Sequence, residues 1–102
     1  MDRQKLYTIA CYPGTFDPIT MGHLDIIERA SRLFEKVIVL VADPLHKKCL
    51  FQINERVEMV IESISHLPNV SVDVLRGTLL MEYCKKHGVG VVIRGCLLYT
   101  SD

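Results

Sequence analysis

Residues 12–23 read Tyr-Pro-Gly-Thr-Phe-Asp-Pro-Ile-Thr-Met-Gly-His, and this stretch decides how the chain is expected to fold. It separates an apolar run, Tyr7–Tyr12, from an amphipathic one, Leu24–Phe34. A strand therefore leads into a short loop with glycine and proline, and the loop opens into a helix. Helix N-termini bind anions, and the loop brings Thr15 and His23 to such an end. The stretch predicts a phosphate site with a candidate catalytic histidine.

The alternation of apolar strands and amphipathic helices continues along the chain. The expected strands are Leu6–Tyr12, Val37–Ala42, Val70–Leu75 and Val89–Ile93, and the expected helices are Leu24–Phe34, a segment capped by Asn54, and Leu79–His87. Val37–Ala42 is apolar at every position, which is typical of a parallel strand covered on both faces. The order βαβαβαβ predicts the α/β class, with a Rossmann-like parallel sheet, flanking helices and right-handed crossovers.

Several charged side chains follow the ends of the expected strands. In parallel sheets ligands bind at the carboxyl ends of the strands. The loops after the first, second and fourth strands hold Thr15 and His23, then Lys47 and Lys48, then Arg94 and Gly95. A histidine, two lysines and an arginine are therefore expected to converge at one edge of the sheet.

Composition limits the classes of function and the cellular locations that fit this chain. The 102 residues suit one domain, and twelve basic and twelve acidic residues balance, which gives no support for a nucleic-acid or membrane-surface binder. The longest apolar run, Val37–Ala42, is too short to span a bilayer, and the polar N-terminus does not resemble a signal peptide. The four cysteines show no metal-binding spacing and read as thiols of a reducing compartment. A cytoplasmic protein is expected.

Several motifs together resemble one enzyme family. Residues 14–18 (GTFDP) and 20–23 (T-x-G-H) match the nucleotidyltransferase signature, in which the first position of the second motif varies. The further matches are Tyr12-Pro13, Lys47-Lys48 followed by Phe51, Glu55-Arg56-Val57, and Ile93-Arg94-Gly95. In this order they are similar to the phosphopantetheine adenylyltransferase family over about residues 6–95.

The resemblance implies a reaction and its partners. The phosphate of 4′-phosphopantetheine would attack the α-phosphorus of ATP, which gives dephospho-coenzyme A and pyrophosphate, with Mg²⁺ assisting and no covalent enzyme intermediate. Catalysis would rest on positioning the substrates in line and stabilising the developing charge. Members of the family are commonly hexameric, but the sequence itself identifies no interface.

The resemblance also assigns residues of the first loop. His23 would donate to the α-phosphate oxygens, and Thr15 would bind the attacking phosphate and ATP. Gly22 would let the ATP phosphates approach the backbone, and Phe16 would offer its backbone N–H to ATP while its side chain packs in the core. Asp17 is expected to brace the loop as a hydrogen-bond acceptor, and no residue is assigned to a metal.

The resemblance in the later motifs assigns residues that would bind the acceptor, 4′-phosphopantetheine. Lys47 would be catalytic and would bind the substrate phosphate as a mobile charge. Arg94, at the end of the fourth strand, would contact the phosphate of phosphopantetheine. Leu79 would line its pantetheine arm.

The family pattern stops after Gly95. The tail Cys96–Asp102 has Leu97 where the family has a second arginine, and a downstream glutamate and an I-S-S/T motif are absent. The sequence therefore predicts the N-terminal part of a nucleotidyltransferase domain over residues 1–95, with the C-terminal part of the family fold missing, and a non-family tail over 96–102 that suggests a truncated gene fragment. An uncovered sheet edge would make such a chain marginally stable.

Two alternatives remain open. Nicotinate- or nicotinamide-mononucleotide adenylyltransferases and glycerol-3-phosphate cytidylyltransferases share part of the signature, but they carry histidine where Thr20 stands, so Thr20 favours the phosphopantetheine branch. A chain that lacks part of its ATP site could instead be a catalytically incompetent module that binds phosphopantetheine only.

Overall fold

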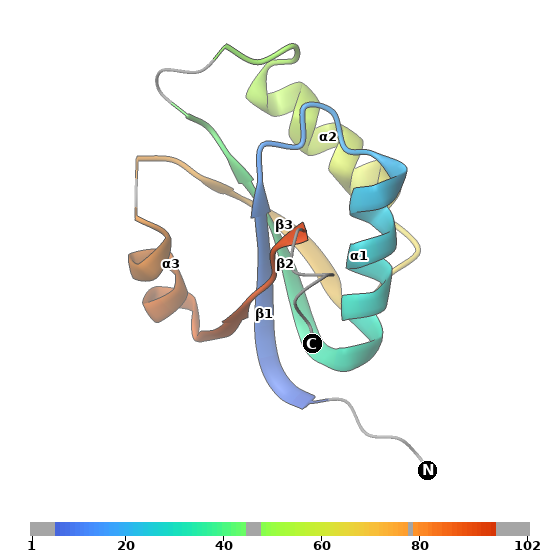
Figure 1. The fold of residues 1–102 in the computed structure, drawn as a ribbon, viewed down its shortest axis with the longest axis vertical. Coiled ribbons are helices and arrows are strands. Elements are labelled where there is room, and N and C mark those ends of the chain that lie inside the picture. The colour runs from blue at the N-terminus through green and yellow to red at the C-terminus, as the bar shows by residue number, and fades with distance from the viewer. Residues whose placement is uncertain (1–5, 45–47, 78, 96–102) are drawn as a thin grey trace.

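Strands and helices alternate along the chain in the predicted order. The structure is a computed structural model, and it describes residues 6–44, 48–77 and 79–95. The elements are β1 (Leu6–Gly14), α1 (Met21–Leu33), β2 (Phe34–Ala42), α2 (Ile53–Ser63), β3 (Val70–Leu75), α3 (Leu80–His87) and β4 (Val89–Val92). Their arrangement is that of an α/β protein (Figure 1).

The four described strands form one sheet in the order β3-β2-β1-β4. Ala10 of β1 lies opposite Val37 of β2 and opposite Val91 of β4. Val39 of β2 lies opposite Val72 of β3. Every pairing is parallel, which confirms the predicted Rossmann-like sheet. Because parallel strands end at the same edge, the loops that follow them share that edge.

Helices cover both faces of the sheet, with α1 and α2 on one face and α3 on the other (Figure 1). Successive side chains of a strand point to opposite faces, so Tyr12 packs with α1 and α2 whereas Cys11 packs with α3. In β2, residues 37–41 are buried at every position, as expected for a strand covered on both faces. This central strand therefore anchors both layers of the core.

Two predicted helix starts are wrong. α1 begins at Met21 and not at Leu24, because Thr20 caps the helix: its backbone is extended and its side chain accepts a hydrogen bond from His23 N–H. α2 is preceded by Gln52 and not capped by Asn54, because the Gln52 N–H donates to Glu55 Oε1 at 2.9 Å. The first correction places His23 inside the first turn of α1.

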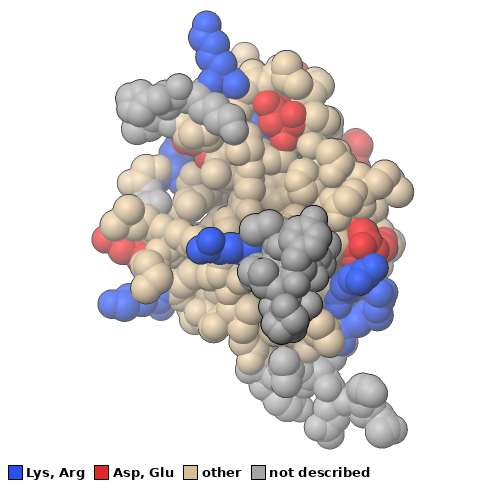
Figure 2. All heavy atoms as spheres, viewed as in Figure 1, with Lys and Arg blue, Asp and Glu red and all other residues tan. Residues whose placement is uncertain are grey.

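Charged residues of both signs are dispersed over the face shown in Figure 2, with wide uncharged areas between them. No helix in the described part of the chain is both long and apolar enough to cross a membrane.

Candidate phosphate site at the carboxyl edge of the sheet

The loop between β1 and α1 rises from the carboxyl end of β1 and enters the helix directly (Figure 1). Gly14 is the last residue of β1, and Thr20 is the N-cap of α1. The first backbone N–H groups of α1 have no partner within the helix, and the helix dipole adds positive potential at this end. The loop therefore has the backbone geometry of an anion site.

A reciprocal pair of hydrogen bonds fixes the orientation of His23. The Thr20 N–H donates to His23 Nδ1 at 3.0 Å, and the His23 N–H donates to Thr20 Oγ1 at 3.2 Å. Because Nδ1 accepts, the neutral imidazole carries its hydrogen on Nε2. Among the described residues Nε2 has no partner, so this N–H is free to donate to a ligand.

Packing keeps the His23 ring neutral. The ring meets Phe16 edge-on at a centroid distance of 4.8 Å and Tyr12 at 6.2 Å. Burial against these rings lowers the pKa of His23 below its usual value of 6.5. At neutral pH the side chain is therefore a hydrogen-bond donor through Nε2 and carries no charge.

Phe16 anchors the loop, as the sequence predicts for its side chain. The side chain is 2% exposed and packs edge-on against Tyr12 at 5.4 Å. Its φ of 51° lies in the left-handed region, which non-glycine residues rarely adopt. A Cβ added at Gly14 would lie 3.0 Å from the Phe16 ring, so a larger residue there would require the ring to shift.

Asp17 braces the loop, and this interpretation is confirmed. Its two carboxylate oxygens accept hydrogen bonds from the backbone N–H groups of Leu50 and Phe51, the latter at 2.8 Å. Burial alone would raise the pKa of Asp17, but these two bonds and the nearby Arg56 outweigh it and lower the pKa below 3.8. The loop after β1 is thus tied to the segment that leads into α2.

Arg56 makes more structural contacts than its place in the Glu55-Arg56-Val57 motif at a helix start indicates. Its side chain is 2% exposed, and its guanidinium donates to the carbonyl oxygens of Thr15 at 2.9 Å, Ala42 at 3.0 Å and Phe51 at 3.0 Å. It also lies 3.5 Å from Asp43. The signal was present: Arg56 precedes Val60 by four residues, which places it on the buried face of α2.

The remaining predicted residues lie along the same edge of the sheet. Gly22 is exposed in the first turn of α1, and Thr15 is half-buried beside Phe16. Arg94 is exposed just after β4, and Leu79 is 70% exposed just before α3. Lys47 lies outside the described residues. The structure places Thr15 and Phe16 in the loop and His23 in the first turn of α1, where its ring contacts that of Phe16, whereas the Arg94 side chain makes no hydrogen bond to them.

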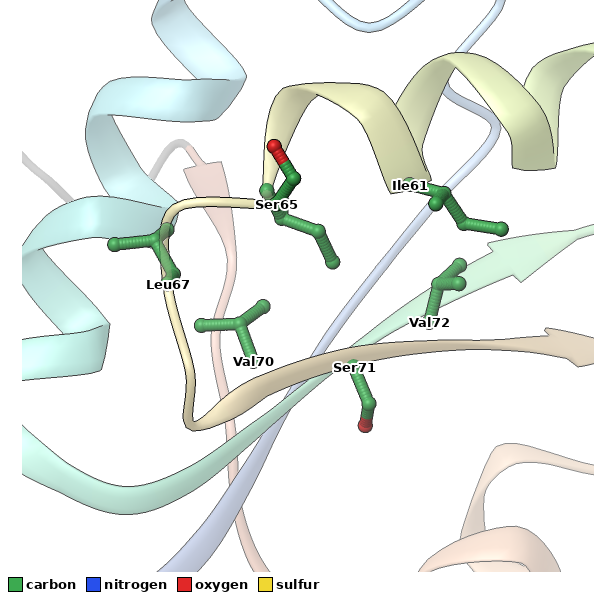
Figure 3. Close-up of a pocket in the computed structure, with 7 residues that line it drawn as sticks. Ile61, Ser65, Leu67, Val70, Ser71 and Val72 are labelled. Carbon is green, nitrogen blue, oxygen red and sulfur yellow. The ribbon is translucent and has the colours of Figure 1, made fainter.

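Two hollows lie away from this loop. One, of about 390 Å³, lies between the end of α2 and the start of β3, where Val70 and Val72 point toward α2 and Ser71 points away (Figure 3). Another, of about 200 Å³, is lined by Ile26, Leu33 and Ile93 between α1 and β4. Neither of these two hollows is lined by a residue of the loop.

The described residues at the edge do not form a metal site by themselves. Within the described ranges, no three His, Cys, Asp or Glu side chains gather closely enough to hold one. The carboxylate of the loop itself, Asp17, already accepts two backbone hydrogen bonds. Mg²⁺ commonly binds through one or two carboxylates together with substrate phosphates. No catalytic step is therefore assigned to a protein-bound metal.

Sequence comparison places the chain among nucleotidyltransferases. The profile of the family described as Cytidylyltransferase-like matches residues 11–102. Proteins named phosphopantetheine adenylyltransferase are similar: that of Bdellovibrio bacteriovorus is 52% identical over 87 residues, which cover 85% of this chain and 54% of the relative. That of Nautilia profundicola is 47% identical over 90 residues, which cover 88% and 58%. The chain spans about half the length of the curated relatives it matches.

Solved structures support the fold. A bifunctional NMN adenylyltransferase/ADP ribose pyrophosphatase from Francisella tularensis, complexed with AMP and a manganese ion, matches with a TM-score of 0.57 and 24% identity, over 81% of this chain and 26% of that chain. Protein Rv1636 from Mycobacterium tuberculosis matches with a TM-score of 0.63 and 12% identity, over 91% and 74%. At these identities the likeness concerns the fold alone.

Proposed function

Because this chain belongs to the cytidylyltransferase-like family, we propose that its β1–α1 loop serves an adenylyl transfer from ATP to 4′-phosphopantetheine. A phosphate oxygen of 4′-phosphopantetheine attacks the α-phosphorus and forms a new P–O bond. The bond from the α-phosphorus to the bridging oxygen breaks, and pyrophosphate leaves with its electron pair. The products are dephospho-coenzyme A and pyrophosphate, a step of coenzyme A biosynthesis. Identities of 46–52% to phosphopantetheine adenylyltransferases support this acceptor.

The orientation of His23 carries the proposal. Its Nδ1 is held by the Thr20 N–H, and its Nε2–H is left as a donor at the start of α1. A neutral donor fixed beside a helix N-terminus suits an α-phosphate oxygen on which charge develops in the transition state. No proton has to leave His23 for this role. The chemistry then needs the two substrates in line and little rearrangement of the loop.

The other residues of the loop complete the ATP side. Thr15 offers its hydroxyl between the two phosphate groups, and Phe16 offers its backbone N–H to ATP. Gly22 keeps the first turn of α1 open: a Cβ there would meet only Thr20 Oγ1, at 3.7 Å, so the fold itself does not require glycine. A glycine at position 22 is explained if a phosphate approaches the backbone closely there.

The acceptor side is proposed from residues of the later loops. Lys47 binds the attacking phosphate and steadies the transferring group, next to the exposed Lys48. Arg94 contacts the phosphate of phosphopantetheine, and its exposure after β4 leaves its guanidinium available. Leu79 offers an apolar surface to the pantetheine arm, since it is 70% exposed at the start of α3.

Mg²⁺ is proposed to arrive bound to the triphosphate of ATP, where it would neutralise phosphate charge. A cytoplasmic location is proposed as well, since Cys11, Cys49 and Cys84 are free thiols, which a reducing compartment maintains. Cell fractionation with antibody detection tests the location.

Product analysis tests the proposed reaction. The chain is incubated with ATP, MgCl₂ and 4′-phosphopantetheine, and dephospho-coenzyme A and pyrophosphate are quantified by mass spectrometry. We expect His23→Ala to lower the rate by about 10²–10³, the usual loss for one transition-state donor, while 4′-phosphopantetheine binding by calorimetry is retained. His66→Ala is the matched control, because His66 pairs with Glu28 on the surface.

Three outcomes would contradict the proposal. Turnover with nicotinamide mononucleotide or glycerol 3-phosphate in place of 4′-phosphopantetheine would assign another acceptor. Binding of 4′-phosphopantetheine without ATP binding or pyrophosphate release would make the chain a binding module. An unchanged rate in His23→Ala would remove the proposed role of the histidine.

A further inference from the structure

The loops after β1, β2 and β3 are joined by one network of charged groups. Asp17, after β1, holds two backbone N–H groups of the segment before α2. Arg56, in the first turn of α2, holds carbonyl oxygens after β1, at the end of β2 and before α2. Asp43, after β2, lies 3.5 Å from Arg56 and 3.4 Å from Arg76, which follows β3. We call Asp17, Arg56 and Asp43 the clasp.

Asp17 and Arg56 each reach from their own segment to the other one. Asp17 reaches from the first loop and binds donors of the second, at Leu50 and Phe51. Arg56 reaches from the second segment and binds an acceptor of the first, at Thr15. Two crossing sets of bonds between the same segments prevent the segments from sliding or separating independently. The first segment holds His23, and the second begins just after the lysine pair 47–48.

The chemistry of Arg56 suits this task. A guanidinium has five N–H donors in a rigid plane, and here it reaches three carbonyl oxygens and one carboxylate. At 2% exposure the charge is removed from water and needs those partners. A lysine ammonium at this position could not reach all of them from one point.

We propose that Asp17 and Arg56 are positioning residues that hold residues 14–23 and residues 48–52 as one unit, so that a ligand bound at the first segment orders the second. This inference rests on the proposed function for the identity of the ligand, ATP, but the coupling of the two loops does not depend on it. Neither residue touches the reacting atoms in this scheme. Their contribution is the relative placement of two phosphate-binding segments.

Amide hydrogen exchange by NMR tests the clasp without ligand. In Asp17→Asn, the side chain presents one acceptor oxygen and one NH₂ donor, so it cannot accept from both Leu50 and Phe51. We expect at least one of these amides to exchange about tenfold faster or more, because a hydrogen bond to a charged group is lost, while amides of β1 and β2 are unchanged. Asp25→Asn, an exposed carboxylate paired with Arg29, is the matched control.

A second variant guards against a general loss of folding. Arg56→Lys keeps the charge but not the three-way contact, so we expect exchange to accelerate more in residues 14–17, 42–43 and 50–52 than in the core strands. Arg29→Lys is its control, since Arg29 is exposed and pairs only with Asp25 among the described residues. Equal acceleration of exchange in the loops and in the core strands would mean a global stabilising role, and it would overturn the inference. Unchanged exchange at Leu50 and Phe51 in Asp17→Asn would overturn it too.

Addition of ATP with MgCl₂ provides the functional readout. In the unmodified chain, we expect shift changes in residues 14–24 to be accompanied by slower exchange in residues 48–52. In Asp17→Asn, the changes should remain in residues 14–24. Equally slowed exchange in residues 48–52 of both proteins would contradict the proposed coupling of the two segments. No response of the unmodified chain to ATP would contradict the proposed function, while the ligand-free exchange would still decide whether the clasp exists.

Discussion

The two sides of the sheet edge differ in how firmly they are held. On the β1 side, the Phe16 ring, the Thr20–His23 pair and Asp17 fix the loop in the absence of ligand. By contrast, Arg94 after β4 is exposed and makes no ion pair with the described residues, and Leu79, which follows β3 and precedes α3, is largely exposed. A fixed donor set binds at a lower entropic cost than one that must be ordered. Under the proposed function, this contrast predicts a pre-organised ATP side and an acceptor side that becomes ordered when its substrate binds.

The largest expected effect is a difference in the free energy of unfolding between Arg56→Ala and Arg94→Ala. Arg56→Ala leaves three carbonyl oxygens and Asp43 without their donor, so we expect a loss of about 3–5 kcal/mol in the free energy of unfolding. Arg94→Ala should change it by less than about 0.5 kcal/mol, while weakening the binding of 4′-phosphopantetheine. Urea denaturation followed by circular dichroism measures both. Similar losses in the two variants would remove the contrast.

Gly14 and Gly22, which flank the β1–α1 loop, are expected to respond differently to substitution by alanine. Gly14→Ala places a Cβ 3.0 Å from the Phe16 ring, and we expect overpacking to cost about 1–3 kcal/mol. Gly22→Ala meets only an ordinary contact in the first turn of α1, and it should stabilise the fold by up to about 1 kcal/mol. Calorimetry should show weaker ATP binding in the more stable Gly22→Ala protein. Unchanged ATP affinity would mean that no phosphate approaches Gly22.

The smallest expected effect is a pH dependence from His23. Burial lowers the folded pKa of His23 below 6.5, so the unfolded chain binds this proton more readily. This contribution to stability is fully present above pH 6.5 and is lost as the pH falls toward the folded pKa. His23→Gln can keep the bond to the Thr20 N–H but does not titrate, so its stability should fall less between pH 6.5 and 5. Parallel curves for the two proteins would contradict this.

Much of the fold was predictable because burial leaves a clear record in sequence. The unbroken apolar run of β2 identified a strand covered on both faces, and the alternation of elements identified a parallel sheet. α1 begins before the predicted Leu24 because the Thr20 cap lies outside the apolar periodicity that marks the helix in the sequence. The capping residue of α2 was missed because Asn54 is the better cap by residue type, whereas a hydrogen bond between Gln52 and Glu55 decides the start.

Within the site, only features that depend on residues close together in the sequence were predictable. Asp17 as a brace and Phe16 as a core side chain followed from the loop itself, and both are confirmed. The contacts of Arg56 join residues 41 and 14 positions apart, and no local pattern reveals such pairs. The roles of His23, Thr15, Lys47, Leu79 and Arg94 toward substrates remain predictions, as does the division of the chain after residue 95.

The buried thiol of Cys11 gives this protein a built-in reporter of sheet opening. Cys11 is fully buried in β1, and burial, with the neighbouring Cys84 thiol, raises its pKa to about 12. Alkylating reagents attack the thiolate, so this sulfur is protected both by exclusion of the reagent and by its protonation. Its labelling rate in the native protein therefore measures how often β1 separates from α3, while the half-buried Cys49 near the lysine pair reports the local motion of its own loop.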